Sequence, residues 1–152
     1  MNKKRIIKIS IFISLILIIY IVYKNTIGND IFMINLRWNI SIPKADNTIY
    51  SKLPESSFNG DGITYLVYNY KNNKKIEKLN KFNWTGTNDN NELEEDFKDE
   101  HLFNELDIPK EYRFNLNDEY LYYKRSRKNN TEIIWIVYMI KENKLYIYEI
   151  IS

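Results

Sequence analysis

The chain of 152 residues contains no cysteine, four glycines, three prolines and a single histidine, His101. Without cysteine it forms no disulfides and offers neither thiol chemistry nor cysteine-ligated zinc. One histidine excludes a histidine cluster for a catalytic metal, and four glycines leave no room for a glycine-rich phosphate-binding loop. The nucleophile motif Gly-x-Ser-x-Gly is also missing. We therefore expect no metal and no cofactor.

Basic and acidic residues nearly balance, 22 against 20. Four of the basic residues and none of the acidic ones precede residue 24, which leaves 18 basic and 20 acidic side chains in the rest of the chain. A nucleic-acid-binding domain needs a strongly basic face, so no nucleic acid is expected as a partner. The roughly 120 residues after this basic amino-terminal segment are enough for one compact domain.

One long apolar run, from Ile9 to Tyr23, contains no charged residue. Ile6 and Ile7 extend it past Lys8. A helix over these residues would measure about 27 Å, close to the roughly 30 Å of a bilayer's hydrocarbon core. The run therefore predicts a transmembrane helix over Ile6–Tyr23, with the membrane as a partner of the chain.

The basic residues around this run predict its orientation. Lys3, Lys4 and Arg5 precede it, whereas Lys24 alone flanks the other end. By the positive-inside rule the amino terminus stays in the cytoplasm and the following chain is extracellular. We expect a single-pass, signal-anchored protein of the cell membrane.

The predicted anchor divides the chain into three parts. They are a cytoplasmic tip with the transmembrane segment (1–24), a short stalk (25–31) and an exported domain (32–152). A signal peptide cleaved near Gly28 is the alternative, although Thr26-Ile27-Gly28 matches the small-residue cleavage pattern poorly.

Beyond residue 31 the spacing of apolar residues alternates between every second position, typical of strands, and about every 3.6 positions, typical of helices. Apolar residues at every second position from Phe32 to Ile42 predict a half-buried strand that ends at Pro43. Further strands are predicted at 47–52, 63–70, 120–125, 133–140 and 145–151, helices at 76–82 and 91–106, a tight turn at 58–62 and an alternating segment at 112–116. The last two strands, joined by "KENK", form a terminal hairpin. This order predicts an α+β fold, an antiparallel sheet with two short helices on one face.

Four stretches occur in order along this region: "ISIPK", "FNGDGITYLV", "LDIPKEYRF" and "YYKR…EIIWIVYMIKENKLYIYE". From Ile40 to Glu149 the chain resembles small membrane-anchored proteins of AT-rich Gram-positive bacteria. The resemblance implies export and a single domain, and it assigns no catalytic or binding residue.

Asp61, between Gly60 and Gly62, is the first candidate binding residue. A carboxylate between glycines can approach a metal or a sugar hydroxyl closely. A tight turn explains the same residues without any ligand, and both interpretations stay open.

The stretch "KRSRKNN" (124–130) with its neighbouring tyrosines is the second candidate. Tyr120 and Tyr122 share one face of a strand, and Arg125 and Arg127 add positive charge. Such a surface suits an anionic lipid, a wall polymer or another envelope protein. The alternatives are that the tyrosines belong to the core and that the charges protect a sheet edge.

These residues predict a non-enzymatic binding or interaction module at the cell envelope. The alternative is a small envelope hydrolase that uses Asp61 with Glu94 or Glu95. The acidic stretch at 92–100 is interpreted as the solvated face of a capped helix, and His101 as a structural residue.

Overall fold

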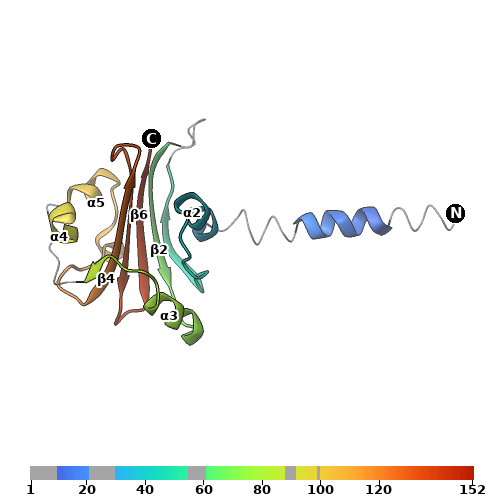
Figure 1. The fold of residues 1–152 in the computed structure, drawn as a ribbon, viewed down its shortest axis with the longest axis horizontal. Coiled ribbons are helices and arrows are strands. Elements are labelled where there is room, and N and C mark those ends of the chain that lie inside the picture. Colours follow the sequence, from blue (N-terminus) through green and yellow to red (C-terminus); the bar gives the residue numbers. More distant parts are fainter. Residues whose placement is uncertain (1–9, 21–29, 55–60, 88–91, 99) are drawn as a thin grey trace, which may run out of the picture. The chain divides into compact units, whose positions relative to one another are not determined.

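The structure is a computed structural model that describes residues 10–20, 30–54, 61–87, 92–98 and 100–152 (Figure 1). The chain divides into two compact units, Met1–Lys44 and Ala45–Ser152. Two helical segments belong to the smaller unit, and the sheet belongs to the larger one. Most of the predicted stalk and most of the predicted turn at 58–62 lie outside the described residues.

In the smaller unit residues 10–20 are helical, and the large apolar side chains of this helix are 50–65% exposed. These eleven residues rise about 16 Å, roughly half of the hydrocarbon thickness that a spanning helix must match. In the described part of the chain, no helix is both long and apolar enough to cross a membrane. The predicted transmembrane helix and the single-pass membrane localisation are therefore wrong. Residues 6–9 and 21–23 of the predicted span lie outside the described residues.

The strand predicted from Phe32 to Ile42 is also wrong, because Asp30–Trp38 forms helix α2. Ile31, Ile34 and Trp38 are buried at the three- and four-residue spacing of a helix. The side chain of Asn35 in α2 accepts a hydrogen bond from the Ile42 N–H and donates one to the Ile42 carbonyl, both at 2.8 Å. This side-chain amide thus satisfies both backbone groups of Ile42, as a neighbouring strand would.

The larger unit contains one antiparallel sheet of six strands in the order β1-β2-β6-β5-β4-β3. The strands are β1 Asn47–Lys52, β2 Gly62–Asn69, β3 Gly86–Thr87, β4 Tyr120–Arg127, β5 Glu132–Met139 and β6 Lys144–Ile151. The prediction of an α+β fold built on an antiparallel sheet is confirmed. The terminal hairpin is confirmed as β5 and β6, which pair without interruption.

Both faces of the central strands are buried. Leu66, Ile147 and Ile136 are paired neighbours across β2, β6 and β5 on one face. On the other face Trp135 and Tyr148 are paired neighbours and belong to the main aromatic core. Because side chains alternate along a strand, burial on both faces makes β5 and β6 almost continuously apolar.

Three α-helices and one 3₁₀ turn accompany the sheet: α3 Asn73–Asn80, α4 Glu92–Phe97, α5 His101–Glu105 and η1 Lys110–Tyr112. The single helix predicted over 91–106 is wrong, because Glu100 has a left-handed φ of 51° that separates α4 from α5. The alternating segment at 112–116 forms no strand and follows η1 instead.

The helical segments lie on both faces of the sheet, which corrects the prediction of helices on one face. The Phe97 ring of α4 packs edge-on against Trp135 with centroids 5.8 Å apart. Trp84, which follows α3, stacks on Tyr138 at 6.0 Å. Trp135 and Tyr138 are three residues apart in one strand, so their side chains point to opposite faces.

Candidate functional site

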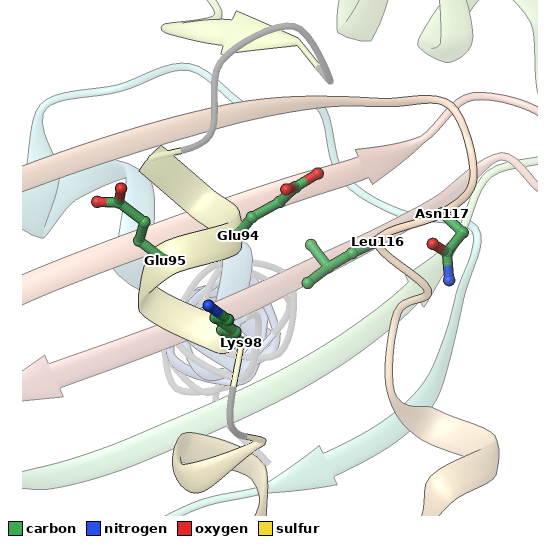
Figure 2. Close-up of a pocket in the computed structure, with 5 residues that line it drawn as sticks. All are labelled: Glu94, Glu95, Lys98, Leu116 and Asn117. Carbon is green, nitrogen blue, oxygen red and sulfur yellow. The ribbon is translucent and has the colours of Figure 1, made fainter.

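A hollow of about 440 Å³ lies beside α4 and is lined by Glu94, Glu95, Lys98, Leu116 and Asn117 (Figure 2). The first three residues come from α4 and the turn after it, and the other two from the segment before β4. Figure 2 shows Glu94 extending toward the side of Leu116 and Asn117, whereas Glu95 extends the opposite way.

The α4 wall of this hollow is anchored to the sheet. Leu93 and Phe97 are buried one helical turn apart, which turns Glu94 and Glu95 outward. Asp96 Oδ2 accepts a hydrogen bond of 2.7 Å from Trp135 Nε1. The same oxygen lies 2.7 Å from the ammonium group of Lys124. Strands β4 and β5 therefore hold this short helix in place.

The opposite wall is a loop that hydrogen-bonds within itself. The Asn115 side chain accepts the Asn117 N–H at 3.1 Å and donates to Asp118 Oδ2 at 2.9 Å. The Phe114 ring packs edge-on against Phe97 with centroids 5.0 Å apart. This contact joins the loop to α4, so both walls of the hollow are preformed.

A second hollow of about 460 Å³ adjoins the first and is lined by Thr87, Asn117, Glu119, Tyr120, Leu121, Ile140 and Lys141. Asn117 lines both hollows. Burial raises the pKa of the Tyr120 hydroxyl above its ordinary value, and the negative charge of Glu94 raises it further. Tyr120 therefore stays protonated at neutral pH.

The two linings combine carboxylates, ammonium groups, an amide and a hydroxyl. This mixture can donate and accept hydrogen bonds with a polar ligand. It holds no imidazole or thiol, because His101 starts α5 on the surface and lines neither hollow. Within the described ranges, no three His, Cys, Asp or Glu side chains come together in a way that could hold a metal ion.

Asp61 lies far from the hollows. It precedes Gly62, which pairs with Ile151 at one end of the sheet. Tyr120 lies at the other end, in the row that contains Asn69. From Gly62 to Asn69 there are seven residue-to-residue steps along β2, about 23 Å of strand. The structure therefore does not bring Asp61 together with Glu94 or Glu95.

Tyr120 and Tyr122 lie in the aromatic core and are fully buried, with 0% of each residue exposed. Their rings contact each other edge-on at 6.4 Å. They offer no extended surface to a large partner, although Tyr120 forms part of the second hollow's lining.

Arg125 and Arg127 both belong to β4, which continues two residues past the strand predicted at 120–125. Arg125 is exposed, whereas Arg127 Nε lies 2.7 Å from the carboxylate of Glu132, which is 2% exposed. Lys128 contacts the same carboxylate at 2.5 Å. The hydrogen bond from Lys128, together with the charge of Arg127, holds the pKa of Glu132 below its ordinary value. Turn residues Lys128, Asn129 and Asn130 have positive φ.

Leu116 and Asn117 were missed by sequence reasoning. Asn115 could have indicated an ordered loop, because its side chain can hydrogen-bond the backbone two residues later. The sequence near Asn115 does not indicate, however, that this loop lies beside α4. In comparisons with protein-family models, curated proteins and solved structures, no match to this chain was found.

Proposed function

We propose that this protein is a non-enzymatic binding module that holds a polar segment of a partner protein in the two hollows that meet at Asn117. The observation that carries the proposal is this pair of adjoining hollows, about 440 and 460 Å³, at one end of the sheet. Each volume lies in the range of ligand pockets, roughly 300–1,000 Å³.

The lining supports a peptide as the ligand. Glu94 and Lys98 line the first hollow, Glu119 and Lys141 line the second, and Asn117 lines both. A polypeptide presents both N–H donors and carbonyl acceptors at short intervals, which this mixed lining can satisfy. Because both walls are anchored, binding requires little ordering of the protein itself.

The hydrolase alternative has no support in the geometry. Hydrolysis by two carboxylates requires them about 5–9 Å apart across the substrate. Asp61 precedes Gly62, and about 23 Å of strand lies between Gly62 and the row of Tyr120, which lines the second hollow. Glu94 and Glu95 extend in opposite directions (Figure 2).

Photo-crosslinking in the cell tests the binding proposal, because it captures a partner whose identity is not specified in advance. A photoreactive amino acid replaces Asn117 in the full chain, and in a matched control it replaces Asn80, an exposed asparagine of α3. We expect irradiation to give a discrete protein adduct at position 117 that is weak or missing at position 80. Adding Glu94→Lys should reduce that adduct. Equal adducts at the two positions, or none at position 117, would overturn the proposal.

A further inference from the structure

Helix α3 and the residues that flank it carry a high density of positive charge. Residues 71–81 include five lysines and a single acidic residue, Glu77. Lys74, Lys78 and Lys81 are all exposed. They follow one another at four- and three-residue spacing, so their side chains lie along one side of the helix. These three residues are called the lysine row below.

The opposite side of α3 is attached to the protein. Leu79 is fully buried, and Ile76, one turn earlier on the same side, is half-buried. Trp84 Nε1 donates to the Leu79 carbonyl at 2.9 Å, which ties down the last turn. Lys81 is the C-cap residue and keeps a right-handed helical backbone, so it continues the row. Figure 1 shows α3 at the end of the sheet where β2 leads into it. The lysine row therefore faces solvent from a fixed helix.

The positive charge of the lysine row is not neutralised by contacts. Lys75, which lies outside the row, contacts the carboxylate of Asp46. Among the described residues, no carboxylate makes an ion pair with the three ammonium groups of the row. Glu77, the acidic residue of α3, makes no ion pair in this part of the chain either. Five lysines against Glu77 and Asp46 leave the segment with a net positive charge.

The residue type in the row favours phosphate over carboxylate as the ligand. The row contains lysine and no arginine. The planar guanidinium of arginine matches a carboxylate through two parallel hydrogen bonds, whereas the ammonium group of lysine acts as a compact point charge that commonly binds phosphate. Three such point charges in line therefore suit a series of phosphate groups.

The spacing of the row indicates a linear ligand. With a rise of about 1.5 Å per residue, Lys74, Lys78 and Lys81 stand about 6 and 4.5 Å apart along the helix axis. A single phosphate chain carries a charge every few ångströms, about 3.4 Å in one nucleic-acid strand. A flexible chain of this kind can place one phosphate against each lysine.

The surroundings of the row distinguish between phosphate-bearing ligands. A helix that binds a lipid surface inserts apolar side chains, but Ile76 and Leu79 lie on the packed side of α3. Single-stranded nucleic acids stack their bases on aromatic side chains, and α3 has none. Duplex nucleic acids need a wider basic face. A chain of bare phosphates requires none of these features.

We propose that the lysine row of α3 binds linear inorganic polyphosphate, with one ammonium group against each of three phosphates along the chain. None of these lysines lines the hollows that meet at Asn117. The inference therefore stands apart from the binding function proposed above.

The test measures binding of the full chain to end-labelled inorganic polyphosphate by fluorescence anisotropy. Three phosphate contacts should make the affinity fall roughly twentyfold between about 50 and 200 mM salt. Lys78→Gln should remove about a third of this salt dependence and weaken binding about eightfold at about 50 mM salt. The matched control Lys110→Gln, at an exposed lysine of η1, should change neither.

A variant that moves one charge separates the row from the net charge of the chain. Lys78→Gln with Asn80→Lys restores the net charge but places the lysine on another side of α3, because residues two apart do not share a helical face. It should bind as weakly as Lys78→Gln alone, and circular dichroism should show that both variants are folded.

Four results would overturn the proposal. They are no binding of polyphosphate by the wild type, wild-type affinity in the charge-moving variant, equally tight binding of polyglutamate or oligothymidylate, and binding of phosphatidylglycerol vesicles without binding of polyphosphate.

Discussion

At the scale of single residues, Asp46 connects the start of β1 to the start of α3. Its carboxylate accepts the backbone N–H groups of Lys71 at 2.8 Å and Asn72 at 3.0 Å. It also accepts a hydrogen bond from the ammonium group of Lys75. Asn72 then caps α3 by accepting the Lys74 N–H at 3.0 Å. One carboxylate thus sets where this helix begins.

These contacts predict a pH dependence of stability. The Lys75 hydrogen bond, followed by those from the two backbone N–H groups, lowers the pKa of Asp46 from 3.8 to about 2. Since the folded-state pKa lies below the unfolded one, the contribution of Asp46 is fully present above the unfolded pKa. It is lost as pH falls through the folded pKa.

Comparison with Asp46→Asn measures this contribution. We expect the variant to unfold at a lower urea concentration than the wild type near neutral pH, with a gap that narrows between about pH 4 and pH 2. Urea unfolding followed by circular dichroism across this range gives the two curves. A gap that persists unchanged at about pH 2 would contradict the assignment.

At the scale of elements, the strands of the sheet differ sharply in burial. Ile147 lies in the middle of β6 with 0% of its surface exposed, between strands β2 and β5. Ile49 lies in β1, which pairs with β2, and is 36% exposed. The same residue type therefore has opposite environments in one sheet.

Substitution of each isoleucine by alanine should lower the free energy of unfolding by different amounts in these two environments. Ile147→Ala leaves a cavity between close-packed strands and should cost about 2–5 kcal/mol of the free energy of unfolding. Ile49→Ala removes atoms that already contact water and should cost less than about 1 kcal/mol. Urea unfolding of the two full-length variants provides the comparison, and similar losses for both would refute the burial argument.

The elements also differ in how well local pattern predicts them. The β5–β6 hairpin follows from two apolar runs around a short polar turn, which needs no information from elsewhere. The pattern at α2 is ambiguous, because Ile34 and Trp38 fit both period two and helical spacing. Ile31 completes the helical set of buried residues, but burial is a property of the folded chain.

At the scale of the whole molecule, the sheet should be most stable at its centre. β5 and β6 have strands on both sides and burial on both faces. β1 is an outer strand whose residues are mostly exposed. Local opening frees outer strands at a lower cost than central ones.

Hydrogen exchange read by mass spectrometry on the full chain tests this gradient. Hydrogen-bonded amides of β5 and β6 should exchange more than about tenfold more slowly than those of β1. A uniform rate across the three strands would mean that the sheet opens only as one unit, against the expectation.

Side-chain burial explains why the candidate sites were hard to predict. Tyr120 and Tyr122 share a strand face as expected, yet both belong to the buried aromatic core that also contains Phe97 and Phe114. Arg127 follows the same strand but contacts Glu132, which reaches it through the β4–β5 pairing. Residue types and spacing placed these side chains on faces, while the packing of distant segments decided which faces contact solvent.

By itself the sequence determined the lack of cysteine chemistry, the antiparallel hairpin of β5 and β6, and strands β1 and β2, because turn residues and alternation act over a few positions. Only the tertiary structure decided that 30–38 is a helix, that Glu100 interrupts the helix at 92–105, and that Asn117 joins two hollows beside α4. Each of these depends on segments far apart in the chain, whose contacts outweigh local preferences of less than about 1 kcal/mol per residue.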